Sequence, residues 1–117
     1  MSFDSYEKGG VLVVRIKNER LDAGTAPDFK KYLSGCVDQG YCKIVLNLDG
    51  VDFIDSSGLG AIVTVLKKVS GKGDLCICSP TEPVENMFKL TRMERVFKIF
   101  DSEQSAVESL RAAEENN

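Results

Sequence analysis

The sequence predicts an α/β fold: one domain with a mixed, mostly parallel central sheet of about four to five strands and about four helices. Short apolar runs rich in β-branched residues alternate along the chain with amphipathic helical patterns. Alternation of this kind favours a parallel sheet with helices on its faces. The length of 117 residues suits a single domain spanning 1–117. Within it we expect an N-terminal hairpin arm at 1–10 and a frayed polar tail at 114–117.

The first elements are predicted from β-branched residues and turn signals. Residues 11–17 (Val-Leu-Val-Val-Arg-Ile-Lys) predict a strand. Gly9-Gly10 before them predicts a tight turn, so that residues 3–8 form the other arm of a hairpin. Residues 18–24 are expected to form a loop.

A first amphipathic helix follows this loop. Thr25 is expected to be its N-cap, and Pro27 stands in the first turn, where a missing N–H does little harm. Gly40 predicts the end of the helix. The inward-facing stripe is predicted from apolar residues at i, i+3, i+4, i+7 and i+8, which are Phe29, Tyr32, Leu33, Cys36 and Val37.

The same two patterns recur along the rest of the chain. Short apolar runs bounded by turn residues predict strands at 43–48, 74–79 and 96–100. Apolar residues at helical spacing predict three more helices with inner stripes at Leu59, Ile62, Val63 and Leu66, at Val84, Met87, Phe88 and Thr91, and at Ala106, Val107 and Leu110.

Composition and charge exclude several classes of protein. The net charge is −3, and the 15 Lys and Arg residues are scattered rather than clustered, so we expect no direct binding to nucleic acid. No apolar run approaches the roughly 20 residues that span a bilayer. The first residues lack the basic and then apolar character of a signal peptide. We therefore expect a cytoplasmic location without membrane insertion.

Histidine, the commonest general base and metal ligand, is absent from the chain. A Ser-His or Cys-His nucleophile pair cannot be built, which excludes several classes of enzyme. We expect no catalytic residue, no cofactor and no enzymatic activity. The four cysteines lack both a secretory context and paired C-x-x-C spacing. We expect reduced thiols and no metal site, with Cys76 and Cys78 on one face of a strand.

The most distinctive motif is Ile54-Asp55-Ser56-Ser57-Gly58-Leu59-Gly60, which lies between an apolar run and a helical pattern. This is the C-terminal end of a predicted strand, where binding sites of open α/β sheets form. The two glycines are expected to leave the backbone uncovered, so that another molecule can approach closely.

Three interpretations of this motif remain open from the residues alone. In the first, Asp55, Ser56 or Ser57 simply caps the following helix. In the second, the loop binds a nucleotide phosphate, although neither the P-loop nor the G-x-G-x-x-G spacing is present. In the third, a serine accepts a phosphate from another protein, which supplies the metal and the base.

The same motif, preceded by Ile44-Val45-Leu46-Asn47-Leu48, resembles the signature of the STAS domain, and in particular of stand-alone anti-sigma factor antagonists. Leu21-Asp22-Ala23-Gly24-Thr25-Ala26 matches the family's loop before the first helix, and Leu90 to Phe100 followed by Ala106 matches its C-terminal pattern. The resemblance implies partner switching. The unphosphorylated antagonist binds an anti-sigma factor serine kinase and releases the sigma factor, phosphorylation blocks this binding, and a metal-dependent serine phosphatase reverses the modification.

Carried over to this chain, the resemblance implies phosphorylation at Ser56, and the choice of Ser56 over Ser57 rests on the resemblance alone. It implies a partner-binding surface made of Asp22, Thr25, Asp55, Ser57, Gly58, Leu59 and Gly60. Two other functions stay open. One is a non-enzymatic STAS subunit of a lipid-transport complex or another regulatory switch without a sigma factor, and the other is a nucleotide-responsive module that uses the glycine-rich edge.

Overall fold

A five-stranded sheet in the order β1-β2-β4-β6-β7 forms the centre of the molecule. The computed structural model of the chain describes residues 2–115. The antiparallel β1–β2 hairpin is followed by parallel pairs only, which confirms the predicted mixed, mostly parallel sheet. The strands of this sheet are β1 (Phe3–Lys8), β2 (Val11–Ile16), β4 (Lys43–Asn47), β6 (Asp74–Cys78) and β7 (Lys98–Phe100).

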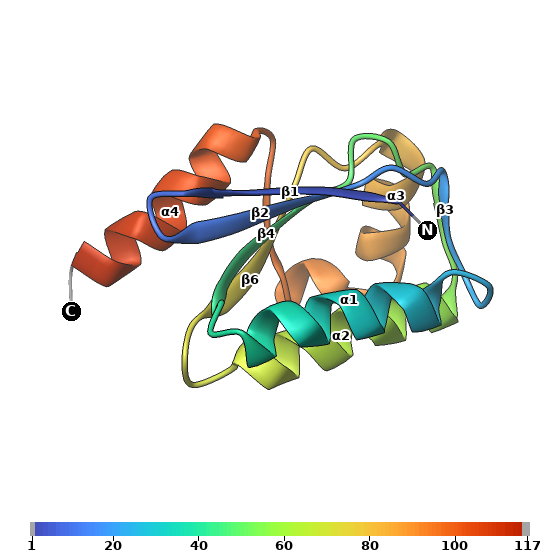
Figure 1. Cartoon of the computed structure of the whole chain (residues 1–117). Helices are drawn as coiled ribbons and strands as arrows, with labels where there is room; N and C mark the ends of the chain where they lie inside the picture. The colour runs from blue at the N-terminus through green and yellow to red at the C-terminus, as the bar shows by residue number, and fades with distance from the viewer. Residues whose placement is uncertain (1, 116–117) are drawn as a thin grey trace.

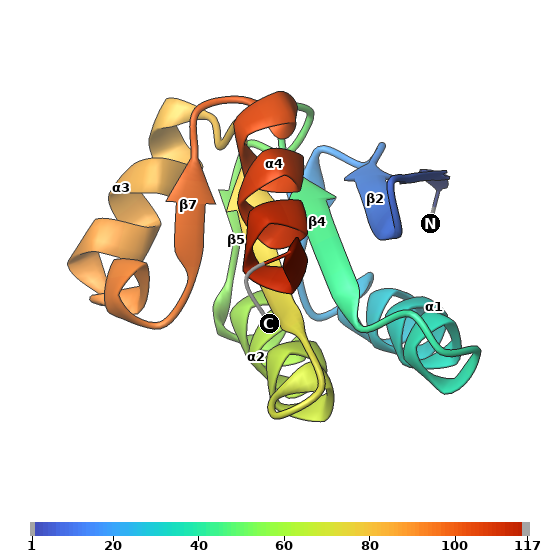
Figure 2. The ribbon, with the colours of Figure 1, turned by 90° about the vertical axis from the view of Figure 1, so that its left-hand side faces the viewer.

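Helices cover both faces of this sheet (Figures 1 and 2). Side by side on one face lie α1 (Ala26–Asp38) and α2 (Ser56–Val69), while α4 (Glu103–Glu115) lies on the other. The chain continues from β6 through α3 (Glu82–Leu90) and a short 3-10 helix, η1 (Met93–Arg95), to β7. The four α-helices match the predicted number.

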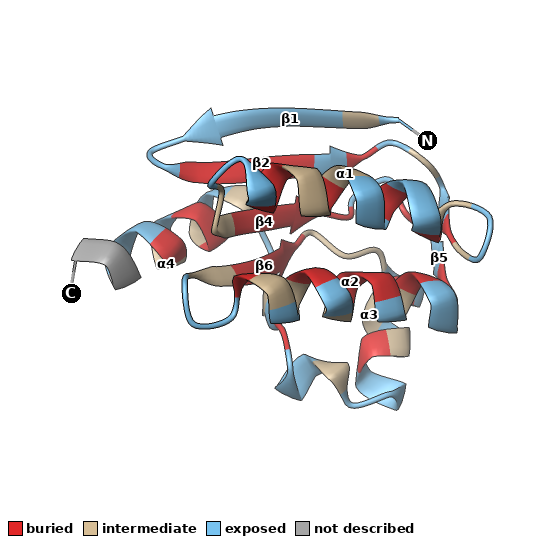
Figure 3. Cartoon of the chain, turned by 60° about the horizontal axis from the view of Figure 1, so that its bottom comes forward, coloured by how far each residue is buried: buried red, intermediate tan, exposed pale blue. Residues whose placement is uncertain are grey.

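Side-chain alternation along the strands divides the core into two clusters. In β2, Leu12 and Val14 pack toward α1 and α2, whereas Val11 and Val13 pack toward α4. Figure 3 shows β2, β4 and β6 buried behind the exposed outer sides of α1 and α2. Strands covered on both faces are apolar at nearly every position, as is typical of parallel sheets. Among residues 2–115, no helix combines the length and apolarity needed to cross a membrane.

A second, two-stranded sheet was not expected from the sequence. β3 (Arg20–Leu21) pairs in parallel with β5 (Phe53–Ile54). β3 lies within residues 18–24, for which a loop is predicted. Two residues are too short to show the alternation by which a strand is recognised. This pairing places the loop after β3 directly beside the motif after β5.

The inner stripe of α2 also differs from the prediction. Ile62 is buried as expected, but Leu59, Val63 and Leu66 are only half-buried. The buried face of α2 is centred on smaller residues instead, and it consists of Gly58, Ala61, Ile62, Val65 and Val69. Small residues are needed there because the start of α2 lies close against the backbone of β3.

The last helices follow the sequence more closely. In α3, Val84 and Phe88 are buried, but Met87 is half-buried and Thr91, the residue after the helix, is exposed. In α4 the predicted stripe is buried, with Ala106, Val107 and Leu110 at 0–3% exposure. This helix continues to Glu115, two residues into the segment 114–117 for which fraying is predicted, and residues 116–117 lie outside the described part of the chain.

All four cysteines are free thiols. Cys76 and Cys78 pack on the α4 side of β6, which confirms that they share one strand face. Burial raises the pKa of Cys76 to about 12 and that of Cys78 to about 11. Burial also raises the pKa of the Cys36 thiol, whereas Cys42 lies half-exposed. The cysteines of β6 therefore act as apolar core residues.

We predict that iodoacetamide at mildly alkaline pH modifies Cys42 first. Cys76 and Cys78 should react more than about tenfold more slowly, because the thiolate is the nucleophile and a raised pKa keeps the thiol protonated. Time-resolved mass spectrometry of the intact chain measures these rates. A Cys42→Ser variant should lose the fast reaction, and equal rates at all sites would contradict the burial of the β6 thiols.

Candidate functional site

The serine motif forms the first turn of α2, directly after β5. Asp55 is the N-cap of this helix: its backbone is extended, and its Oδ1 accepts a hydrogen bond from the Gly58 amide at 2.9 Å. A carboxylate at this position satisfies one of the free N–H groups of the first turn and interacts favourably with the helix dipole. Of the three predicted capping residues, Asp55 fills the role and leaves the hydroxyls of Ser56 and Ser57 free of it.

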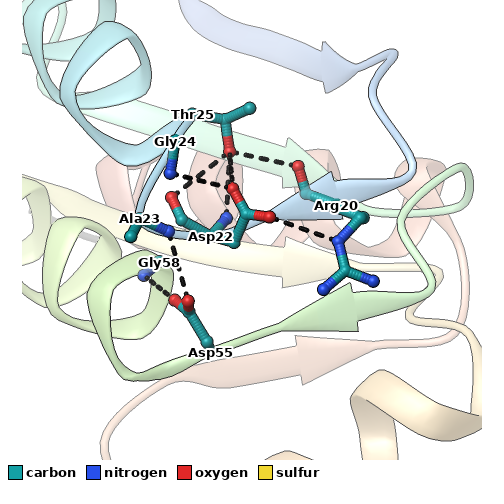
Figure 4. Close-up of polar contacts among 7 residues, drawn as sticks. All are labelled: Arg20, Asp22, Ala23, Gly24, Thr25, Asp55 and Gly58. Atoms are coloured by element: carbon teal, nitrogen blue, oxygen red, sulfur yellow. Dashed lines mark hydrogen bonds and ion pairs between the residues drawn. The ribbon is translucent and has the colours of Figure 1, made fainter.

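The second oxygen of Asp55 holds a neighbouring loop. Its Oδ2 accepts a hydrogen bond from the Ala23 amide at 3.2 Å (Figure 4). The backbone adds to this contact, because the Asp55 amide donates to the Leu21 carbonyl at 3.2 Å. One carboxylate therefore joins the start of α2 to the loop at 22–25, although the two segments are more than thirty residues apart in the sequence.

The loop at 22–25 has its own network of hydrogen bonds (Figure 4). Asp22 Oδ1 accepts from the Gly24 amide at 3.0 Å. The Thr25 hydroxyl accepts from the Asp22 amide at 2.9 Å and donates to the Arg20 carbonyl at 3.1 Å. Thr25 is the N-cap residue of α1, as predicted, but its side chain forms no cap hydrogen bond. Its hydroxyl closes the loop because β3 places the acceptor and the donor within reach.

Arg20 supports the outer side of this loop. Its Nε donates to Asp22 Oδ2 at 3.2 Å, and its guanidinium carbon lies 4.0 Å from the centre of the Phe53 ring. Arg20 and Phe53 are register partners in the β3–β5 pair, which explains this stacking. The hydrogen bond from Arg20 holds the pKa of the Asp22 carboxyl below its usual range, together with backbone donors at Gly24 and Thr25. Asp22 therefore carries a full negative charge at neutral pH.

The two glycines of the motif play different roles. A Cβ atom on Gly58 would lie 2.2 Å from the Leu21 carbonyl oxygen, whereas a Cβ on Gly60 would meet nothing within 4 Å. Gly58 is buried, so the expectation that it leaves the backbone open to another molecule is wrong. Its missing side chain lets α2 pack against β3. Gly60 is exposed, and because it has no side chain, no atoms protrude there beside the serines.

Ser56 and Ser57 are both exposed at the edge of a cleft between the first halves of α1 and α2. The cleft has a volume of about 420 Å³ and is open to solvent. It is lined by Ala23, Ala26, Pro27, Lys30, Ser56, Ser57, Gly60, Ala61 and Thr64. Both hydroxyls are therefore accessible from solvent, and Lys30 is the one charged residue among those that line the cleft.

Most of the predicted site residues come together in this region. Asp22, Thr25, Asp55, Ser56 and Ser57 lie within or beside the network and the cleft, and Leu59 is half-buried against the core. Sequence reasoning missed the residues contributed by neighbouring elements, namely Arg20, Phe53, Pro27, Lys30 and Thr64. The helical spacing places Lys30 one turn after Ala26, but only the packing of α1 beside α2 shows that both helices share a cleft. Within residues 2–115, no group of three or more potential metal ligands gathers.

We predict opposite effects for alanine at the two glycines of α2. Gly58→Ala should lower the free energy of unfolding by about 2–3 kcal/mol, because the added methyl overlaps the Leu21 carbonyl. Gly60→Ala should leave it unchanged or raise it by up to about 1 kcal/mol, because alanine favours a helix and the methyl meets no neighbour. Urea denaturation of both variants tests the pair, and an equal loss in both would contradict the close contact at Gly58.

We also predict that the lowered pKa of Asp22 depends on Arg20. Because the folded-state pKa is lowered, the Arg20–Asp22 contact stabilises the fold at neutral pH and is lost as the pH falls through that pKa. In an NMR titration of the side-chain carboxyl carbon, Arg20→Gln should raise the Asp22 pKa toward its usual range. Arg15→Gln is the matched control, since Arg15 pairs with Asp49, and it should leave the Asp22 titration unchanged.

Comparison with known proteins shows the family of this chain. The model of the STAS domain family matches residues 2–106. The anti-sigma F factor antagonist of Paenibacillus polymyxa is 32% identical over 103 residues, which cover 86% of this chain and 87% of the relative. A Thermotoga maritima protein, provisionally named an anti-sigma factor antagonist, is 38% identical over 102 residues, which cover 86% and 90%. These names describe regulatory proteins rather than enzymes, as the sequence predicts.

Solved structures show the same fold. A crystal structure of a Thermotoga maritima protein with the same provisional name superposes with a TM-score of 0.85 at 35% identity, covering 93% of this chain and 94% of that one. The antagonist SpoIIAA in its unphosphorylated form superposes with a TM-score of 0.80 at 20% identity, covering 95% of this chain and 97% of that one. At this identity the match shows a shared fold and nothing more. Because the family model covers residues 2–106 and these relatives are more than 30% identical over most of the chain, this chain belongs to the STAS domain family.

Proposed function

We propose that this chain is an anti-sigma factor antagonist that acts by partner switching. The unphosphorylated form binds an anti-sigma factor that is also a serine kinase, and this binding releases the sigma factor. Phosphorylation of Ser56 by the kinase ends the binding, and a metal-dependent serine phosphatase restores it. The observation that carries the proposal is the exposed Ser56 hydroxyl beside the loop at 22–25, in a chain whose relatives are named anti-sigma factor antagonists.

The proposed partner surface combines residues that shape it with residues that touch the partner. Asp55 and Thr25 use their side chains to hold the loop at 22–25, and Gly58 seats α2 against β3. Direct contacts come from the groups left at the surface. These are Asp22, Ser56, Ser57, Gly60 and the exposed part of Leu59.

The modification needs no catalytic residue in this chain. The kinase aligns the γ-phosphoryl group of ATP with the Ser56 hydroxyl, a new P–O bond forms at Oγ, and the bond to the leaving ADP breaks. The hydroxyl proton passes to a base of the kinase. In the reverse reaction, the phosphatase uses water to release inorganic phosphate. The absence of histidine from the chain is consistent with this division of roles.

A phosphate on Ser56 opposes binding through charge. It adds about −1.5 to −2 at neutral pH, beside the carboxylates of Asp55 and Asp22. At an interface this charge must be desolvated or faces repulsion, and either effect weakens the complex. A loss of about 3 kcal/mol changes the affinity more than a hundredfold.

The fold itself accommodates a phosphate at this position. The first turn of a helix favours an anion, because its free N–H groups and the helix dipole point toward it. The protein SpoIIAA of Bacillus, which shares the fold at 19% identity with a TM-score of 0.71, has been solved in a phosphorylated form. In the proposed switch, the phosphate changes the interface while the domain stays folded. An anti-sigma factor as partner places this switch in the cytoplasm, with no direct contact to DNA.

We predict that an anti-sigma factor kinase encoded in the same genome adds one phosphate to this chain from ATP. Mass spectrometry of the peptide that contains residues 55–60 should place it on Ser56. Ser56→Ala should abolish the modification and Ser57→Ala should retain it. In titrations with the kinase, Ser56→Ala should bind as tightly as the unmodified chain and Ser56→Asp should bind more weakly.

The matched control is Ser70→Asp, which places the same charge on an exposed serine at the opposite end of α2. It should bind the kinase like the unmodified chain. Equal affinities of Ser56→Ala and Ser56→Asp would overturn the charge switch, and phosphate found on Ser57 alone would overturn the choice of acceptor.

A further inference from the structure

The cleft beside the serine motif contains one charged residue, and that residue is a cation. Of the nine residues that line it, Lys30 is the only one with an ionisable side chain. Lys30 is exposed, and within residues 2–115 it forms no ion pair. The proposed switch would place a dianion at the rim of this same cleft.

The two helices place Lys30 and the two serines on the walls of one cleft. α1 and α2 run side by side in the same direction (Figure 1). Their C-terminal halves are joined by Lys68, whose Nζ lies 2.8 Å from Asp38 Oδ1 and 3.4 Å from the Ser34 carbonyl oxygen. Side chains on a helix lean toward its N-terminus, so that of Lys30 leans toward the end of the cleft where Ser56 and Ser57 lie.

The two ends of the α1–α2 contact are therefore unequal. The C-terminal end already has an ion pair between the helices, through Lys68 and Asp38. At the N-terminal end, the cation Lys30 has no counter-ion among residues 2–115. A phosphate on Ser56 would supply the missing anion.

We propose that Lys30 is the intramolecular counter-ion of phosphorylated Ser56. Its ammonium group binds the phosphate across the cleft and joins the first halves of α1 and α2. This inference rests on the proposed phosphorylation of Ser56 and adds to it a regulatory role. By holding the phosphate against the domain, Lys30 slows its removal by a phosphatase and lengthens the lifetime of the phosphorylated state.

The test uses the full chain with phosphoserine incorporated at position 56 during translation, so that no kinase is needed. A ³¹P NMR titration measures the second pKa of the phosphate, which is ordinarily about 6. Lys30→Gln should raise this pKa by about 0.5, because a nearby cation favours the dianion. Lys30→Arg should keep it low. Salt at about 1 M, with a Debye length of about 3 Å, should reduce the difference.

Lys31→Gln provides the matched control. Lys31 is the next residue on α1 but lines a different groove with Ser5 and Tyr32, so its loss removes the same charge from the other side of the helix. The carboxylates of Asp55 and Asp22 and the guanidinium of Arg20 are common to all variants. The Lys31→Gln titration should match that of the chain with both lysines. An unchanged phosphate pKa in Lys30→Gln, or an equal rise in Lys31→Gln, would overturn the contact.

The regulatory part has a separate readout. A broad-specificity metal-dependent serine phosphatase should remove the phosphate several-fold faster from Lys30→Gln than from Lys31→Gln. Equal rates would overturn the effect on lifetime. Neither measurement depends on a cognate kinase. If the Lys30 contact is wrong, these two measurements will show it. If the proposed function is wrong, the kinase reaction will leave Ser56 without phosphate.

Discussion

The site depends on one carboxylate that binds two amides from distant parts of the chain. Asp55 accepts from Gly58 in its own helix and from Ala23 in the loop after β3. The first contact caps α2, and the second fixes where the loop lies relative to that helix. Because the short Asp55 side chain holds both the helix and the loop, the distance between the loop and the serines is fixed. A partner that binds the loop therefore also contacts the serines. The packing of Gly58 against Leu21 makes this geometry possible, since any larger residue would push the two segments apart.

This arrangement separates the groups that build the surface from the group that changes it. Asp55, Thr25 and Arg20 are occupied by hydrogen bonds or stacking within the domain. The Ser56 hydroxyl is exposed at the rim of a mostly uncharged cleft. A covalent phosphate there can alter the electrostatics of the interface without breaking a contact that supports the fold. In the proposed switch, Lys30, the one charged residue that lines the cleft, holds the phosphorylated state.

Much of the fold was predictable because periodicity reports burial. The short apolar runs at 11–17 and 74–79 correctly predicted strands, and the spacing of Ala106, Val107 and Leu110 correctly predicted the inner side of α4. The failures occurred where small residues or very short elements decide the packing. The stripe of α2 was displaced because Gly58 and Ala61 carry little hydrophobic signal, and the β3–β5 pair was missed because each strand has two residues.

By itself the sequence determined the order along the chain of the main-sheet strands and the four α-helices, the place of the serine motif at a helix start and the resemblance to the STAS family. These properties depend on local spacing and residue type, which a linear chain displays directly. Tertiary structure alone decided that Asp55 is the cap, that Gly58 packs rather than opens the surface, and that Lys30 shares a cleft with Ser56. Each of these depends on contacts between segments that are distant in the sequence. The parallel pairing of β3 with β5 and the packing of α1 beside α2 bring these segments together. Contacts of this kind produce no periodic pattern in the sequence, so they could not be predicted from it.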